Sequence, residues 1–359
     1  MNQKEKELFL ELCAFRSPNA KKLERLLRAG AATPEVLGVL FANRMAGVAC
    51  HVLRETEQMS LVDREFRNSL RNASLVNEKI NEDFLGCIKF LSAELDACGV
   101  SYALLKGAYL CHWYPKGCRT SNDIDVLIAP EDVGKVSARL RMAGFRQGHL
   151  KNGAFVPATR QEIIESKMMR GETVPFIKET KLPFMKYLEV DLNFSLDYKN
   201  SDDTVLKEML ARTQVISVGT AKIRTLDPLD FLLHLCAHLY KEATTLPWIR
   251  MKRDMTLYKY CDIYGLLSNL TEEDLLSLKV RARELHLERE LLYCVDGVTS
   301  LLGFSCPLLT EGLHTGEDFD LAQVVSPEEK KTYRYTEKNV RKRFFAKDRT
   351  LLLEVENDQ

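Results

Sequence analysis

The sequence has no surplus of charge of either sign, because 51 Lys and Arg residues balance 51 Asp and Glu residues over 359 positions. A protein that held nucleic acid or a membrane through its overall charge would carry a marked positive excess. The balance excludes that class, so any affinity for polyanions must be local. The length and the 45% content of hydrophobic residues are sufficient for about two domains with buried cores.

Long apolar runs and paired cysteine motifs are also missing. No stretch approaches the length of a membrane-spanning helix, and the opening residues, MNQKEKE, lack the apolar core of a signal peptide. We therefore expect a cytoplasmic protein with no membrane partner. The ten cysteines form no Cys-x-x-Cys pair, and several stand in apolar helical contexts. They are interpreted as reduced packing residues.

What the sequence does contain is a chemically rich stretch at residues 102–127, YALLKGAYLCHWYPKGCRTSNDIDVL. Its pattern predicts a strand, a helix opened by Gly107, and a second strand with Asp-Ile-Asp. Side chains alternate across a strand, so Asp123 and Asp125 point to the same side and can bind the same ions. A surface strand can carry Asp-x-Asp without such a role. Here an apolar run follows, and charge at the end of a buried strand is costly unless cations compensate it.

A second acidic strand is predicted at residues 187–196, YLEVDLNFSL. Its alternation places Glu189, Asp191 and Asn193 on one face and apolar side chains on the other. A site that holds two metal ions needs a third carboxylate from a neighbouring strand, and this segment offers one. The same pattern is also compatible with an edge strand that faces solvent.

These motifs resemble the bacterial family of uncharacterised nucleotidyltransferases within the DNA polymerase beta superfamily. The family pattern runs Leu-Leu-Lys-Gly, a short helix with Tyr-Pro near its end, an Arg, and then Asp-Ile-Asp-hydrophobic-Leu. This chain supplies the pattern in order, as Leu104-Leu105-Lys106-Gly107, Tyr114-Pro115, Arg119 and Asp123-Ile124-Asp125-Val126-Leu127. It departs from the commoner Gly-Ser opening of the superfamily by placing Lys106 before Gly107.

The resemblance implies a role for each of these residues. Asp123 and Asp125 would bridge two Mg²⁺ ions, and a third acid would hold the ion nearest the acceptor. In the family that acid lies centrally in a strand of hydrophobic-Asp-hydrophobic form, which favours Asp191 over Glu189. The residues expected to bind the phosphates of the NTP and to offset the charge of the leaving group are Lys106, Gly107 and Arg119.

We expect an α+β fold, with a small mixed-sheet nucleotidyltransferase core between helical N- and C-terminal regions. The expected divisions are a helical region at 1–98, the core at 99–225, a helical domain at 226–325 and a basic tail at 326–359. Thr33-Pro34 predicts the start of a helix that runs toward Arg54. Residues 151–181 show weak periodicity and are expected to form either a flap over the substrate or a meandering hairpin.

A predicted helix after Asp227-Pro228 carries a polar face made of Asp230, His234, His238 and Lys241, at spacings of four, four and three. Two histidines one turn apart can bind zinc, but no protease motif or third ligand accompanies them. We expect the face to line a cleft, with Lys241 available to bind the triphosphate of a nucleotide.

The segment 330–349 is locally basic, with nine Lys and Arg residues against two acids. Four aromatic residues are interspersed among the cations, and such an arrangement can follow an RNA backbone and stack on bases. A solvated or docked segment is the simpler interpretation, given the zero net charge of the whole chain.

Together the residues and the resemblance predict a Mg²⁺-dependent nucleotidyltransferase. It would move NMP from an NTP to a hydroxyl or phosphate of a small molecule or peptide, and release pyrophosphate. Three alternatives stay open at this point. They are a toxin-like nucleotidyltransferase that acts on transfer RNA, a catalytically silent regulator that binds nucleotide, and a zinc hydrolase built on His234 and His238.

Overall fold

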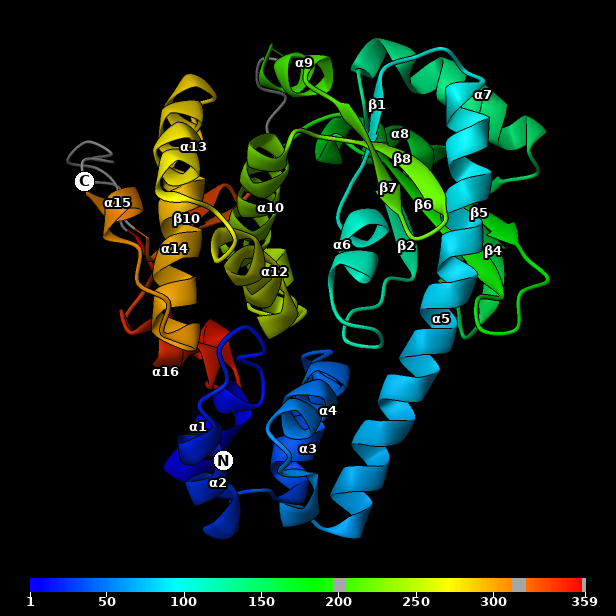
Figure 1. Ribbon diagram of the computed structural model, residues 1–359. Coiled ribbons are helices and arrows are strands. Elements are labelled where there is room, and N and C mark those ends of the chain that lie inside the picture. Colours follow the sequence, from blue (N-terminus) through cyan, green and yellow to red (C-terminus); the bar gives the residue numbers. More distant parts are fainter. Residues whose placement is uncertain (197–203, 312–320, 357–359) are drawn as a thin grey trace. The chain divides into compact units, whose positions relative to one another are not determined.

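The computed structural model describes residues 1–196, 204–311 and 321–356, and the chain divides into two compact units (Figure 1). The first unit combines residues 1–70 with 232–359, and the second comprises residues 71–231. The boundaries fall within α5 (Arg64–Asp96) and α10 (Pro228–Ala243). Parts of the expected core, helical domain and tail, at 197–203, 312–320 and 357–359, lie outside the described residues.

The second unit is built on a six-stranded sheet with the strand order β1-β2-β6-β5-β3-β4. Strands β2 and β6 run parallel, and the other neighbouring pairs are antiparallel. The mixed sheet with its helices confirms the expected α+β fold. The strands are β1 (Tyr102–Leu104), β2 (Asp123–Ile128), β3 (Arg146–Lys151), β4 (Ala154–Pro157), β5 (Phe176–Glu179) and β6 (Tyr187–Asn193).

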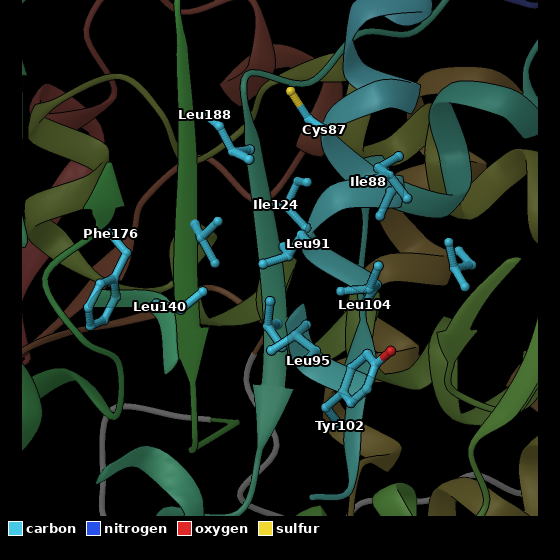
Figure 2. Packing of buried hydrophobic residues seen from close by; sticks show 14 of the residues in the cluster. Cys87, Ile88, Leu91, Leu95, Tyr102, Leu104, Ile124, Leu140, Phe176 and Leu188 are labelled. Atoms are coloured by element: carbon cyan, nitrogen blue, oxygen red, sulfur yellow. The ribbon is translucent and has the colours of Figure 1, made fainter. Parts of the chain in front are cut away.

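One face of this sheet is covered by α5 and α7 (Val133–Met142). Figure 2 shows Ile88, Leu91 and Leu95 of α5 packed toward the strands, at the three- and four-residue spacing that defines one stripe of a helix. They share a buried cluster with Leu140 of α7 and with strand residues that include Leu104, Ile124 and Leu188. This cluster fixes which face of each strand is apolar.

Among the described residues, the second unit also has the α-helices and the two-stranded hairpin named below. The hairpin turns at Gly219, whose φ of 55° lies in the region that glycine adopts without strain. Its last residue, Thr225, donates from Oγ1 to the carbonyl of Leu104 at 2.7 Å. The elements are α6 (Gly107–Trp113), α8 (Arg160–Arg170), α9 (Thr204–Ala211), β7 (Gln214–Val218) and β8 (Ala221–Thr225).

Two expectations about helices were wrong in detail. The helix expected from Thr33 toward Arg54 is two helices, α3 (Pro34–Ala42) and α4 (Ala46–Glu55), which bend by 119° around Arg44 with its positive φ of 56°. In residues 151–181, which were expected to form a flap or a meandering hairpin, the end of a β3–β4 hairpin is present, but α8 and β5 follow it. The missed signal was the capping box of α8, in which Thr159 and Glu162 bond reciprocally.

The first unit joins both ends of the chain. The ring of Phe9 on α1 stacks on Phe344 with centroids 6.0 Å apart, and Asn43 accepts a hydrogen bond from the backbone N–H of Leu257 at 2.9 Å. Its elements are α1 (Gln3–Glu11), α2 (Ala20–Arg28), α3, α4, α11 (Leu246–Arg250), α12 (Leu257–Leu267), α13 (Glu272–Glu284), α14 (Glu288–Leu302), α15 (Pro307–Thr310), β9 (Gln323–Ser326), β10 (Lys331–Tyr335), α16 (Val340–Phe344) and β11 (Leu353–Val355).

No single helix within the described ranges is both long enough and apolar enough to cross a membrane, although α3 and α4 pass that test when taken together. The described residues include all ten cysteines. Every one of them is buried and none forms a disulfide. Their interpretation as packing residues therefore agrees with the structure.

The packing of α5 gives the first prediction. Replacing the fully buried Leu91 by Ala removes apolar contacts and leaves a cavity, so we expect the free energy of unfolding of this unit to fall by about 2–5 kcal/mol. Leu75→Ala on the same helix is the matched control, because Leu75 is 55% exposed and its truncation should cost much less. Urea titration followed by circular dichroism measures both. Equal losses would contradict the assignment of this face.

Candidate active site on strands β2 and β6

The candidate site lies where β2 and β6 pair in parallel. Their register sets Asp123 beside Glu189 and Asp125 beside Asp191. The intervening residues of both strands belong to the buried cluster under the sheet. Because side chains alternate along a strand, the four carboxylates therefore project from the opposite face. Strand β6 lies between β2 and β5, so the alternative of a solvent-facing edge strand was wrong.

Asp125 is the most enclosed of the three aspartates, and its side chain is only 9% exposed. Its Oδ1 atom accepts a hydrogen bond from Lys106 Nζ at 2.7 Å, and Asn193 Nδ2 lies 3.4 Å from the same oxygen. An ammonium at this distance stabilises a buried carboxylate by charge as well as by hydrogen bonding. Lys106 thus forms part of the site, because its ammonium contacts the carboxylate of Asp125, a candidate metal ligand.

The backbone of Lys106 has φ 43° and ψ −112°, a conformation that a residue with a side chain rarely adopts. Lys106 directly precedes the first residue of α6, and its carbonyl accepts the N–H of Leu110 at 2.9 Å. Such backbone strain costs on the order of 1–3 kcal/mol and persists only where the surroundings hold it in place. The strained conformation places the lysine beside Asp125.

Position 107 requires glycine, because Ser121 lies very close to its backbone. A Cβ atom added to Gly107 would overlap both the Cβ and the Oγ of Ser121. The Ser121 hydroxyl donates to Asp123 Oδ1 at 2.9 Å. The sequence analysis attributed Gly107 to phosphate contacts and overlooked Ser121, although this serine stands two residues before Asp123. The role of Gly107 toward phosphate stays a prediction.

Asp191 lies among several acidic side chains of the site. Burial raises the pKa of its carboxyl well above the usual value, and the negative charges of Asp125, Asp123, Glu189 and Glu172 raise it further. The pKa of Glu189 is raised by burial first and then by Asp123 and Asp125. An ordinary pair on a surface strand would not produce such shifts. The face holds more negative charge than Lys106 alone compensates.

Glu172 is a neighbour of this site that the sequence analysis missed. It follows the left-handed Gly171 at the end of α8 and forms an isolated antiparallel bridge with Asn193, the last residue of β6. The flanking N–H of Thr173 donates to the carbonyl of Leu192 at 2.9 Å. The capping box that begins α8 could have indicated the helix before Glu172. The bridge from Glu172 to β6 could not have been predicted from that pattern, because it depends on tertiary folding.

Arg119 lies in the loop between α6 and β2 and is buried, with 6% exposure. Its Nη1 donates to the carbonyl of Thr120, and its own carbonyl accepts from Asn81 Nδ2 on α5 at 3.0 Å. A second asparagine of α5, Asn77, donates to the carbonyl of Gly117 at 2.9 Å. Helix α5 thus fixes the loop that leads into β2. A contact of Arg119 with phosphate stays a prediction.

Lys241, His234 and His238 lie on α10 within the first unit. His238 Nε2 lies 3.4 Å from a carboxylate oxygen of Glu242, which also pairs with Lys259. Burial alone would raise the pKa of Glu242, but His238 and Lys259 outweigh it and hold the pKa below its usual range. These contacts explain part of the polar face as a buried ion-pair network. The nucleotide-binding role of Lys241 stays a prediction.

The basic segment at 330–349 is folded into the first unit. Arg343 is 2% exposed, with its guanidinium 4.7 Å from the centroid of the Tyr335 ring, and Arg349 forms a two-pronged ion pair with the buried Asp254. Lys342 pairs with Glu337 at 3.2 Å. Several of the cations and rings that could contact RNA therefore already have protein partners.

No three His, Cys, Asp or Glu side chains are arranged as a ready metal-binding group within the part of the chain that the structure describes. This leaves the zinc alternative without a ligand set among those residues. The donors on β2 and β6 nevertheless fit Mg²⁺ in kind, because carboxylate oxygens are its usual protein ligands. The raised pKa of Asp191 marks negative charge that a cation would stabilise, and the Lys106 ammonium already contacts Asp125 as one.

Residues 30–303 match a protein family described as uncharacterised nucleotidyltransferase. The chain belongs to this family. No curated protein matches it. A crystal structure of an antigenic nucleotidyltransferase-like protein from Paracoccidioides brasiliensis is similar at 14% identity and a TM-score of 0.34, covering 64% of this chain and 96% of that one. The family match confirms the resemblance that the motifs at 104–127 suggested.

The charge on Asp191 gives a prediction about stability and pH. Its pKa is raised by folding, so its ionised form destabilises the folded state at neutral pH, and this cost is lost as the pH falls toward the value of an unfolded Asp. Asp191→Asn should therefore raise the free energy of unfolding at pH 7–8 without metal, and the gain should shrink at acid pH.

Denaturation with urea in EDTA at several pH values measures the effect of Asp191→Asn. Glu82→Gln on the exposed side of α5 is the control, since it removes an acid that pairs only with Lys79 at the surface. A destabilised Asp191→Asn protein at neutral pH would show that the carboxylate is compensated in the folded state.

Proposed function

We propose that this protein is a Mg²⁺-dependent nucleotidyltransferase that transfers NMP from an NTP to a hydroxyl or phosphate of a small molecule or peptide. The single observation that supports it best is the parallel register that sets Asp125 beside Asp191 and Asp123 beside Glu189 on one face of the sheet. The family match supports nucleotidyl transfer in general. The choice of acceptor rests on the absence of a surplus of positive charge.

The proposed metal ligands are Asp123, Asp125 and Asp191. Two bound Mg²⁺ ions would neutralise phosphate charge and favour deprotonation of the acceptor. If the Lys106 ammonium leaves Oδ1 of Asp125, the phosphates of the incoming NTP are its natural new partner. Asp191 would then lie on the acceptor side, where its negative charge would stabilise the cation next to the attacking oxygen.

In the proposed reaction an acceptor oxygen attacks the α-phosphorus of the NTP. A new P–O bond forms to the acceptor while the bond between the α-phosphorus and its bridging oxygen breaks. The electron pair of that bond leaves with pyrophosphate, and the acceptor loses its proton to solvent. Lys106 and Arg119 would stabilise the charge that develops on the leaving group. Lys241 is proposed as a further contact of the triphosphate.

The test uses each labelled NTP with Mg²⁺ and separate RNA, protein and small-metabolite fractions. Label transferred to a small molecule or a peptide, together with pyrophosphate release, would support the proposal. Transfer of the label to RNA would instead support the toxin-like alternative. Absence of Mg²⁺-dependent NTP binding would favour a silent protein and overturn the proposal.

Removal of one metal ligand should abolish the reaction. Asp123→Asn and Asp125→Asn keep the size of the side chain but lose the negative charge that a shared cation requires, so we expect no measurable transfer in either variant. Circular dichroism should show that both remain folded, and Glu82→Gln should retain wild-type turnover. Wild-type turnover in either Asn variant would rule out the assigned ligands.

Lys106 should matter both with and without nucleotide. Lys106→Met retains the aliphatic chain but loses the ammonium, so kcat/KM for NTP should fall by about 2–4 kcal/mol of transition-state stabilisation. The same variant should be less stable than the wild type in EDTA, because Asp125 loses its contact with the Lys106 ammonium. Lys116→Met, at an exposed position of the next loop, is the control. Normal kinetics would place the lysine away from the phosphates.

A further inference from the structure

Ser121 makes two contacts that join the start of α6 to the Asp-Ile-Asp strand. Its side chain is 5% exposed and occupies the space where any residue other than glycine at position 107 would place its Cβ. The Ser121 hydroxyl also reaches Asp123 Oδ1 at 2.9 Å. One small side chain therefore contacts both the opening of the helix and a carboxylate of the candidate site.

The hydrogen bond restricts the orientation of the Asp123 carboxylate. A hydroxyl that donates to an ionised oxygen makes a comparatively strong, charge-assisted bond, and it engages Oδ1. Helix α5 fixes the loop just before Ser121 through Asn77 and Asn81. Ser121 also packs closely on Gly107, in the space that a side chain at position 107 would fill. Both constraints restrict the movement of Ser121. The carboxylate is held before any ligand arrives.

We propose that Ser121 is a positioning residue for Asp123, and that Gly107 serves the site by admitting Ser121. This inference rests on the proposed function, since it gives Asp123 the role of metal ligand. Ser121 has no contact with substrate in this scheme. It acts by holding one carboxylate oxygen so that less ordering is needed when a cation binds, as hydrogen-bonding partners of metal ligands generally do.

The main variant is Ser121→Ala, which keeps the Cβ that packs on Gly107 and removes only the hydroxyl. Mn²⁺ serves as the probe because its binding is followed directly by electron paramagnetic resonance without nucleotide or turnover. We expect the dissociation constant for Mn²⁺ to rise about 10–100-fold, with thermal stability nearly unchanged. Ser121→Cys, similar in size but a weaker donor, should give a smaller rise and covers the case in which Ser121→Ala does not fold.

A pair of variants separates packing from positioning. Gly107→Ala should lose stability because the new methyl overlaps Ser121, although Ala is favoured over Gly within a helix. Ser121→Gly in the Gly107→Ala background frees that space, so stability should return. Mn²⁺ affinity should stay weak in the double variant because the hydroxyl is still missing. A residue with a packing role alone would recover both properties together.

The outcomes distinguish this inference from the proposed function. Wild-type Mn²⁺ affinity and kcat/KM in Ser121→Ala would overturn the positioning role and leave nucleotidyl transfer standing. Recovery of full Mn²⁺ affinity in the Gly107→Ala, Ser121→Gly protein would also overturn it. The metal assignment fails if the wild type binds no Mn²⁺, even when Gly107→Ala loses stability and the Gly107→Ala, Ser121→Gly protein recovers it. The positioning role then fails with it.

Discussion

The placement of Asp125 beside Asp191 on two parallel strands is the constraint on which the rest of the site depends. Two carboxylates on adjacent strands repel each other, and burial strengthens the repulsion. The arrangement survives because the other face of both strands is held by the apolar cluster against α5 and α7. A slip of one residue would expose that cluster, so the hydrophobic pattern secures a register that charge alone would oppose.

Three polar contacts then offset part of the repulsion. Lys106, just after β1, and Asn193, at the end of β6, approach Asp125 from the two strands that flank β2. Ser121 bonds to Asp123. The positive φ of Lys106 shows that the backbone is held in an unfavourable conformation where the lysine meets its partner. Lys106, next to the first residue of α6, compensates charge on Asp125, and Gly107 leaves space for Ser121.

Local pattern was sufficient to predict β1, β2 and β6 and the side that carries the acids. The period of two in β6 sets Glu189, Asp191 and Asn193 apart from its apolar residues, and the structure shows that alternation of burial. Parallel pairing with β2 could not be read from either strand alone. Glu172 and the junction of α1 with α16 were missed for the same reason, because each depends on contacts between residues distant in the sequence. The bend around Arg44 was missed because the apolar pattern continues through it.

The basic segment illustrates why residue type alone does not determine a binding surface. Arg and aromatic side chains favour contact with RNA, and they equally favour contact with each other inside a folded unit. In this structure the guanidinium of Arg343 lies over the ring of Tyr335, and Arg349 forms an ion pair with Asp254. At the carboxylate face the acids lie close to one another, and the pKa of Asp191 is raised by burial and by its acidic neighbours. Any cation that bound this face only in the folded state would stabilise the unit, so binding and folding would be linked.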